Sequence, residues 1–296
     1  EGTRAFGDVY LGLVLWRMLG LDQLLDRVLP KGREWIPWPI VAAILALARF
    51  CEPSSELHTA QTWYRSTGLD DLLGVAMQYV DKDRLYRAHD KVLPLKQEIE
   101  KHLKERFSTL FDAEYDLLLY DVTSTYFEGE AQGNPQAQRG YSRDHRPDCK
   151  QVCIGLVVTQ SGLPVAYEVF DGNRNDVTTV EEIVESMEAK YGKAHRIWVL
   201  DRGMVNPENL EFIQDREGRY IVGTPKNMLK QYEQALLNQE DWTQVQDGLE
   251  VKTCASPEGQ ETFILCRSQA RREKEKAMHE RFEKRIEEGL TQVEHF

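Results

Sequence analysis

The sequence predicts an α/β fold, in which a mixed five-stranded sheet with flanking helices follows an all-α region. Residues 1–111 carry helix-period apolar patterns with almost no strand-like alternation, and this pattern changes at about residue 112. From there the elements run β-β-β-α-β-α-β. A strand meander followed by alternating helices and strands favours a mixed sheet with helices on its faces.

The first 111 residues are expected to form a helical domain. Dense apolar positions precede Gly20, and Pro39 suits the first turn of a helix over residues 40–50. Further helical stretches are predicted over residues 54–65, 81–93 and 95–107, with Pro94 breaking the pattern between the last two.

Five strands are predicted for the sheet: residues 115–120, 151–159, 163–170, 197–200 and 220–222. The Gln160-Ser161-Gly162 segment is a hairpin signal between the second and third strands. Thr178 and Glu181 have the spacing of a capping box, which predicts a helix start there, and Gly192 ends this helix. Asn206 and Pro207 are expected to begin the second helix of this region.

Residues 227–296 are predicted to form a hairpin and one long charged helix. The hairpin pairs residues 249–254 with 261–267 and turns at residues 256–259, and the helix runs from residue 268 to about 293. The helix carries one apolar stripe: Met278, Phe282, Ile286 and Leu290. We expect a solvated helix that packs by this seam, with DNA contact as the alternative for Arg271, Arg272, Lys274 and Lys276.

Two aspartates, Asp121 and Asp201, each close an apolar strand. A carboxylate in that place is costly unless it binds a cation or is paired, although an aspartate also ends strands by capping the next turn. If the first and fourth strands are neighbours, the two residues meet beyond the carboxyl ends of the strands, where such sheets bind ligands. Two carboxylates suit Mg²⁺, and two ions about 3.5–4 Å apart activate phosphodiester chemistry.

The connection over residues 124–150 is long for a compact domain, and a loop of this length is usually functional or disordered. Its second half mixes basic and aromatic side chains, which fits a strand of DNA passing the metal site. Its candidate phosphate contacts are Arg139, Arg143, His145, Arg146 and Lys150. The alternative is a solvated loop pinned by Asp–Arg pairs. Asp176 is expected near a helix N-terminus, with a direct metal role as its alternative.

Composition narrows the class of protein. The net charge of −12 argues against a general nucleic-acid coat, but a DNA enzyme needs only a local basic surface. Five scattered cysteines do not suggest a disulfide framework, and an intracellular, reducing location is expected. The best apolar run, residues 36–50, is too short to span a membrane.

Several segments together resemble a known family. They are residues 121–125, 140–148, Gly172-Asn173 with Asp176, residues 201–204 and residues 220–226. In these segments the chain is similar to bacterial insertion-sequence transposases of the DDE type, in the branch with a β-rich insertion in a ribonuclease H-like catalytic core. The resemblance is strong over residues 112–296 and looser over the helical region.

The resemblance implies roles for particular residues. Asp121 and Asp201 match the first two catalytic aspartates, which would hold two Mg²⁺ or Mn²⁺ ions. Residues 112–226 would be the first part of the ribonuclease H-like core, residues 1–111 the part that binds DNA ends, and residues 227–296 an incomplete insertion. The third acid of the family, a glutamate, has no match before Phe296, so we expect an N-terminal fragment or a truncated copy.

The implied function is DNA transposition by metal-dependent phosphodiester hydrolysis and strand transfer at transposon ends. The partners would be terminal inverted repeats and target DNA, with a homodimer forming on the DNA, in a cytoplasmic, nucleoid-associated bacterial protein without membrane contact. Arg202 joins the expected DNA-binding residues. The alternatives are a catalytically inactive, truncated DNA-binding remnant and another ribonuclease H-like nuclease.

Overall fold

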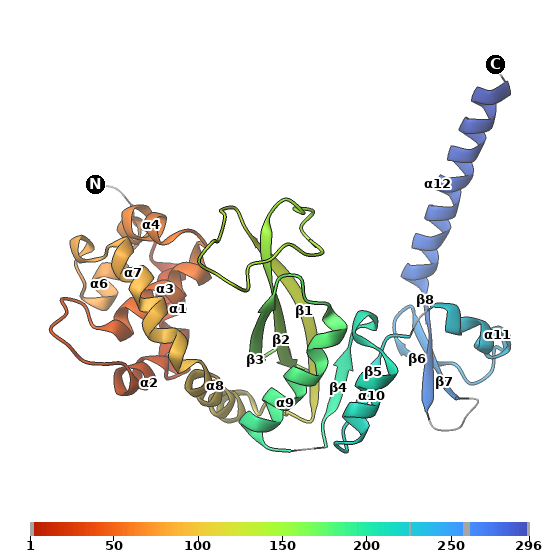
Figure 1. Ribbon diagram of the computed structural model, residues 1–296, viewed down its shortest axis with the longest axis horizontal. Helices are drawn as coiled ribbons and strands as arrows, with labels where there is room; N and C mark the ends of the chain where they lie inside the picture. Colours follow the sequence, from red (N-terminus) through yellow and green to blue (C-terminus); the bar gives the residue numbers. More distant parts are fainter. Residues whose placement is uncertain (1–2, 194, 225, 257–260, 295–296) are drawn as a thin grey trace. The chain divides into compact units, whose positions relative to one another are not determined.

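The computed structural model describes residues 3–193, 195–224, 226–256 and 261–294 (Figure 1). The chain divides into two compact units, Glu1–Gly223 and Thr224–Phe296. The first unit contains two hydrophobic clusters, one among the N-terminal helices and one on the five-stranded sheet.

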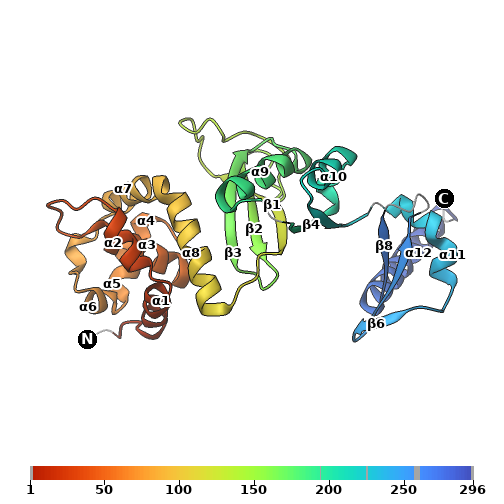
Figure 2. The ribbon, with the colours of Figure 1, turned by 90° about the horizontal axis from the view of Figure 1, so that it is seen from below.

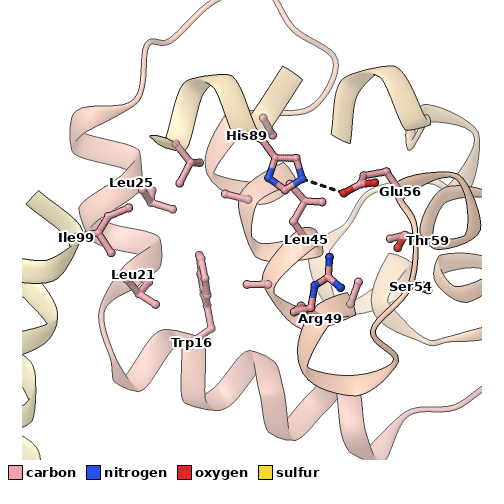
Figure 3. Close-up of a pocket in the computed structure, with 15 residues that line it drawn as sticks. Trp16, Leu21, Leu25, Leu45, Arg49, Ser54, Glu56, Thr59, His89 and Ile99 are labelled. Atoms are coloured by element: carbon pink, nitrogen blue, oxygen red, sulfur yellow. Dashed lines mark hydrogen bonds and ion pairs between the residues drawn. The ribbon is translucent and has the colours of Figure 1, made fainter. Parts of the chain in front are cut away.

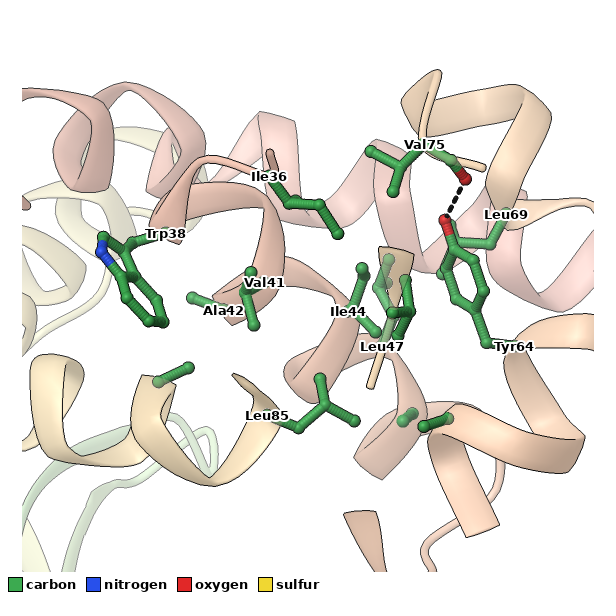
Figure 4. Packing of buried hydrophobic residues seen from close by; sticks show 14 of the residues in the cluster. Ile36, Trp38, Val41, Ala42, Ile44, Leu47, Tyr64, Leu69, Val75 and Leu85 are labelled. Atoms are coloured by element: carbon green, nitrogen blue, oxygen red, sulfur yellow. Dashed lines mark hydrogen bonds between the residues drawn. The ribbon is translucent and has the colours of Figure 1, made fainter. Parts of the chain in front are cut away.

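The N-terminal helices pack around α3, whose residues are buried along most of its length. They are α1 (Gly7–Met18), α2 (Leu21–Val28), α3 (Trp38–Cys51), α4 (Glu56–His58), α5 (Tyr64–Ser66), α6 (Leu69–Leu73), α7 (Lys82–Val92) and α8 (Lys96–Phe111). Ile44, Leu47 and Leu85 meet in this core, and the buried Tyr64 donates its hydroxyl hydrogen to the Val75 carbonyl at 2.9 Å (Figure 4). The predicted place of Pro39, in the first turn of α3, is confirmed.

The predicted mixed five-stranded sheet is confirmed. Its strands are β1 (Leu117–Phe127), β2 (Lys150–Thr159), β3 (Pro164–Asp171), β4 (Ile197–Leu200) and β5 (Arg219–Val222). They lie in the order β3-β2-β1-β4-β5, in which β2 is antiparallel to its two neighbours while β1, β4 and β5 are parallel. This order fits a ribonuclease H-like core, and it makes the first and fourth strands neighbours.

Two helices cover one face of this sheet (Figure 2). They are α9 (Val180–Tyr191), preceded by the 3-10 turn η4 (Asp176–Thr179), and α10 (Pro207–Gln214), preceded by the 3-10 turn η5 (Arg202–Met204). Leu118, Tyr120 and Val122 of β1 point into this core. Because side chains alternate along a strand, Asp121 lies on the opposite face.

The first aspartate does not end its strand, as the sequence suggested, because β1 continues six residues further to Phe127. The reason is non-local. On one side β4 stops at Leu200, but on the other side the antiparallel β2 goes on pairing with β1 as far as Lys150. Asp121 therefore lies where β1 loses one neighbour and keeps the other.

The capping box predicted for α9 is wrong. The helix begins at Val180 after η4, and its N-cap is Thr179, whose side chain makes no capping hydrogen bond. The predicted cap, Thr178, lies inside η4, where its hydroxyl donates to the Asn175 carbonyl and accepts from Arg174 Nε, both at 2.8 Å. The Thr179 hydroxyl accepts from Tyr120 Oη at 2.8 Å and donates to the Asp176 carbonyl at 2.6 Å. By contrast, Asn206 caps α10 as expected by accepting from the Asn209 amide at 2.8 Å.

A buried polar cluster fastens α8 to the sheet. Lys190 Nζ lies 2.9 Å from both Glu100 Oε2 and Glu168 Oε1, and Lys96 Nζ lies 2.7 Å from Glu168 Oε2. Burial alone would lower the pKa of Lys190, but the two carboxylates outweigh it and raise that pKa. The ion pairs therefore tie the N-terminal helices to β3 and α9.

The second unit contains a three-stranded antiparallel sheet and the long helix α12 (Gln269–Glu294). The predicted hairpin is confirmed as β7 (Leu249–Ala255) and β8 (Thr262–Ser268), while β6 (Thr243–Gln246) was not predicted. The hairpin turn at residues 257–260 lies outside the described residues. Met278, Phe282 and Ile286 of the α12 stripe are exposed, and the side chain of Leu290 is outside the described part.

Within the part of the chain that the structure describes, no helix combines the length and the apolar character needed to cross a membrane.

Candidate metal and DNA site

The two predicted aspartates lie side by side. Strands β1 and β4 run parallel, and their last paired residues are Tyr120 and Leu200. Asp121 and Asp201 are the next residues on each strand, so they hold equivalent positions on strands that are about 4.8 Å apart. Both residues are exposed and line one cleft of about 480 Å³.

The cleft has a mostly apolar floor, which includes Leu156 and Val199. Asp121 Oδ1 accepts a hydrogen bond from the Val122 amide at 2.9 Å. Asp201 has extended backbone and precedes η5, and its carbonyl accepts from the Met204 amide at 3.0 Å. Backbone groups thus hold the two aspartates in place, and no lysine or arginine forms an ion pair with either among the described residues.

A third carboxylate, Asp176, stands close to this pair. Its ion pair with Arg143 brings a cation from the long loop to the sheet. Burial raises the pKa of Asp176 and Arg143 opposes this, while the negative charges of Asp121 and Asp201 raise the pKa further. Asp176 Oδ2 also lies 3.9 Å from the position that a Cβ would take on Gly203, two residues after Asp201.

The backbone around Asp176 is tied to both strands that carry the aspartate pair. From β1, the Tyr120 hydroxyl reaches Thr179, which in turn donates to the Asp176 carbonyl. On the β4 side, the buried Asn209 side chain donates from Nδ2 to the Val177 carbonyl at 2.8 Å and to the Met204 carbonyl at 2.9 Å. Asn209 therefore bridges η4, which begins at Asp176, and η5, which follows Asp201.

The donor set fits a hard divalent cation. Among the described residues, no three His, Cys, Asp or Glu side chains come close enough together to hold a metal ion. Mg²⁺ needs fewer protein ligands than that, because it keeps several waters and binds through one or two carboxylates plus substrate phosphate. Asp121 and Asp201 supply these two carboxylates from rigid neighbouring strands.

The residues predicted to contact DNA fall into two groups. Arg143 is held beside the carboxylates by Asp176, and Arg202 directly follows Asp201. Lys150 instead pairs with Phe127 at the far end of the β1–β2 hairpin. Leu156, opposite Asp121, is six residues along β2 from Lys150, which corresponds to about 20 Å at the usual rise of a strand.

The remaining predicted contacts belong to the loop. Arg146 forms an ion pair with Asp148 at 2.9 Å and lies over the Tyr126 ring at the same end of β1, so the Asp–Arg pinning considered as an alternative occurs here. Arg139 donates from Nε to the Asp148 carbonyl at 3.3 Å. His145 is exposed and has a positive φ of 58°.

The base of the loop is held by close backbone packing. A Cβ on Gly140 would lie 2.1 Å from the Gly172 carbonyl oxygen, and one on Gly172 would lie 1.9 Å from the Gln151 carbonyl oxygen. The buried Gln151 donates from Nε2 to the carbonyls of Tyr141 and Gly172, at 3.0 and 2.7 Å. The loop is therefore ordered at its base.

A second cavity, of about 340 Å³, lies among the N-terminal helices (Figure 3). Trp16, Leu25 and Leu45 line it, and His89 Nε2 lies 3.0 Å from Glu56 Oε1 at its edge. Glu56 is the one carboxylate in its lining, so this cavity does not offer the paired oxygens that a hard cation requires.

The family can now be stated. The family profile described as "Transposase DDE domain" matches residues 112–289, which is more than half of the chain. The chain belongs to this family. DDE transposases use divalent metal ions, and the exposed pair Asp121 and Asp201 fits that chemistry.

Solved structures of transposases are also similar to the chain, with low sequence identity and low TM-scores. A piggyBac transposase synaptic complex with hairpin DNA has 11% identity, covers 86% of this chain and 60% of that chain, and gives a TM-score of 0.35. A Mos1 transposase paired-end complex with the left transposon end has 11% identity, covers 72% and 75%, and gives 0.26. The chain thus spans about 60% of the length of the piggyBac transposase structure. The family assignment rests on the profile match, and no curated protein sequence matches the chain.

Proposed function

We propose that this protein is the DNA transposase of an insertion sequence, which hydrolyses a phosphodiester at a transposon end and then transfers the strand. One observation carries this proposal: Asp121 and Asp201 occupy matching positions on two parallel strands, in a chain of the DDE family.

In this proposal Asp121 and Asp201 are the catalytic carboxylates and would hold two Mg²⁺ or Mn²⁺ ions. Such ions polarise the phosphate, activate the attacking oxygen and stabilise the leaving oxygen. Water attacks the phosphorus at the transposon end, which frees a 3′-hydroxyl. This hydroxyl then attacks a phosphodiester of target DNA by in-line displacement. Rigid neighbouring strands suit this chemistry because they fix the carboxylates relative to each other.

The proposed DNA contacts form two groups that differ in their distance from Asp121 and Asp201. Arg143 and Arg202 would contact phosphates at the reacting position. Lys150, with Arg139, His145 and Arg146 of the loop, would contact flanking DNA. The separation of about 20 Å along β2 corresponds to roughly six nucleotides of a duplex strand.

The same proposal assigns the remaining parts of the chain. Residues 1–111 would bind the terminal inverted repeats, residues 112–226 would form the first part of the catalytic core, and residues 227–296 would belong to an insertion in it. Two copies would assemble on the DNA, since a transposon has two ends to be joined to one target.

The test uses Mn²⁺ binding and nicking of labelled duplex DNA. We expect Asp121→Asn and Asp201→Asn each to abolish nicking and to weaken Mn²⁺ binding measured by electron paramagnetic resonance. Asp116→Asn is the matched control, because Asp116 is an exposed aspartate just before the other end of β1. Nicking retained by either site variant would exclude these residues as the catalytic pair.

A second candidate is a DNA-binding protein that occupies transposon ends without cutting them. It is favoured by the finding that no three metal-ligating side chains cluster among the described residues. Duplex binding by the wild-type chain, without nicking in either Mg²⁺ or Mn²⁺, would select this candidate.

A further inference from the structure

The ion pair of Arg143 with Asp176 lies beside the proposed metal site but belongs to neither catalytic aspartate. Arg143 comes from the long loop, and Asp176 begins η4 on the sheet side. Both residues line a cleft of about 420 Å³, and Thr123 lines this cleft as well as the one that contains the aspartate pair. Thr123 is therefore common to the two clefts.

Asp176 has a fixed place in this cleft. Tyr120 and Thr179 tie its backbone to β1, and Asn209 ties the following residue, Val177, to the turn after Asp201. Its Oδ2 atom lies 3.9 Å from the position that a Cβ would take on Gly203. Hydrogen bonds thus hold Asp176 relative to the same two strands that carry the catalytic pair.

The guanidinium of Arg143 has N–H donors that its ion pair with Asp176 does not use. A guanidinium has five N–H groups in a rigid fork, and its Nη2 is the nitrogen that reaches Asp176. Within the described ranges, no other nitrogen of Arg143 has a partner. A guanidinium that is anchored on one side and open on the other is suited to bind a phosphate, because the anchoring lowers the entropy lost on binding.

We propose that Asp176 is a positioning residue, which holds the guanidinium of Arg143 so that it binds a DNA backbone phosphate next to Asp121 and Asp201. The inference rests on the proposed function and deepens it, because it names the residue that positions the guanidinium of Arg143. The bound group is a phosphodiester of either strand, and it is bound irrespective of base sequence.

Two other roles for Asp176 fit the structure less well. As a metal ligand it would have to join the aspartate pair, but no cluster of three ligands forms among the described residues. As a stabiliser of the fold its ion pair would contribute little, since the side chains of Arg143 and Asp176 are 35% and 28% exposed and partly exposed pairs are screened by solvent.

The experiment measures binding of a fluorescein-labelled 30-base-pair duplex of random sequence by anisotropy, in Ca²⁺ and over a range of salt. A random sequence suffices because phosphate contacts carry no sequence information. We expect Arg143→Ala and Asp176→Ala each to weaken binding about fivefold and to reduce the salt slope by about one. The double variant should be no weaker than Arg143→Ala alone, because both changes remove one phosphate contact.

The conservative and control variants separate positioning from charge. Asp176→Asn keeps an oxygen that accepts from Arg143, so its affinity should stay within about twofold of the wild type. Arg216→Ala and Glu185→Ala remove another Arg–carboxylate pair from the same unit, and their effects on duplex binding should be additive. Thermal unfolding of each variant checks that the fold is intact.

Three results would overturn the inference. Duplex binding by Asp176→Ala that is as tight as that of the wild type, or tighter, would make Asp176 a competitor of the DNA. Additive losses at positions 143 and 176 would show that the two residues act separately. A tenfold loss of Mn²⁺ affinity in Asp176→Ala, measured without DNA, would make Asp176 a ligand.

The proposed function fails by a different result. If Asp121→Asn and Asp201→Asn leave Mn²⁺ affinity unchanged, the metal site is wrong, while the coupling between Arg143 and Asp176 is still read from duplex binding. If the wild type shows no salt-dependent duplex binding, both the proposed function and the positioning role of Asp176 are refuted.

Discussion

Replacing Asn209 by alanine should destabilise the first unit and loosen the candidate site together. The Asn209 side chain is buried and joins two turns by hydrogen bonds to the carbonyls of Val177 and Met204, at 2.8 and 2.9 Å. Alanine leaves both carbonyls without this donor. Each lost hydrogen bond costs about 1 kcal/mol, and the unsatisfied carbonyls, buried at Met204 and partly buried at Val177, add to it. We therefore expect a loss of about 2–3 kcal/mol in the free energy of unfolding.

Urea denaturation followed by tryptophan fluorescence measures this loss, since Trp198 is buried in the same core as the sheet. Asn209→Asp is the more severe test. It keeps the size of the side chain but turns a carboxylate towards two carbonyl oxygens, so it should cost more than alanine. Asn206→Ser is the matched control in the same helix, because serine replaces asparagine at an N-cap within about 0.5 kcal/mol.

The reasoning is refuted if Asn209→Ala unfolds within about 0.5 kcal/mol of the wild type, which is the usual range of a surface substitution. It is also refuted if Asn209→Asp is as stable as the wild type. A functional readout follows from the same geometry. Because Asn209 holds the turn after Asp201, its removal should weaken Mn²⁺ binding although Asn209 is no metal ligand.

Other regions of the first unit give further predictions. Lys190 and Glu100 are both nearly buried, and Glu100→Gln leaves Lys190 with Glu168 as its one carboxylate partner. The change should cost about 3 kcal/mol in urea denaturation; a loss below 1 kcal/mol would show that Glu168 alone satisfies the lysine. Burial raises the pKa of Glu168, but hydrogen bonds from two lysines and a serine lower it overall, below its ordinary 4.5. The stability that Glu168 contributes is therefore present above that pH and lost as the pH falls. Asp176 has the opposite sign, because its pKa is raised above 3.8 in the folded protein. Its contribution is present at lower pH and lost as the pH rises through the raised pKa, so Glu168→Gln and Asp176→Asn should change the slope of stability against pH in opposite directions. Gly172→Ala should disrupt the base of the loop, since its Cβ would overlap the Gln151 carbonyl; a soluble variant with wild-type stability and duplex affinity would contradict that packing.

The sheet and the aspartate pair could be predicted because their signals are local. Five short apolar runs indicated the strands. The meeting of the two aspartates was predicted on the condition that the first and fourth strands are neighbours, and the structure meets this condition. Asp121 and Asp201 each follow such a run directly, so neighbouring parallel strands bring them together.

The interactions that fix the site could not be predicted, because they join residues far apart in sequence. The hydrogen bond from Tyr120 to the Thr179 hydroxyl joins residues 59 positions apart. The length of β1 depends on how far β2 pairs with it. Asn209 and Gln151 are single amides in otherwise ordinary elements, and only their carbonyl partners in the folded chain distinguish them.

The packing of Gly140 against Gly172 divides the long loop into two parts that differ in how well they tolerate substitution and insertion. At the base, no side chain can be added without moving backbone. Towards the tip, Gly129 and Gly133 have open space around them. Insertions, affinity tags or a photo-crosslinking amino acid are thus best introduced near these two glycines. There they would extend the loop outward and leave Arg143 in place, so that the path of bound DNA could be mapped by crosslinking in an otherwise unaltered protein.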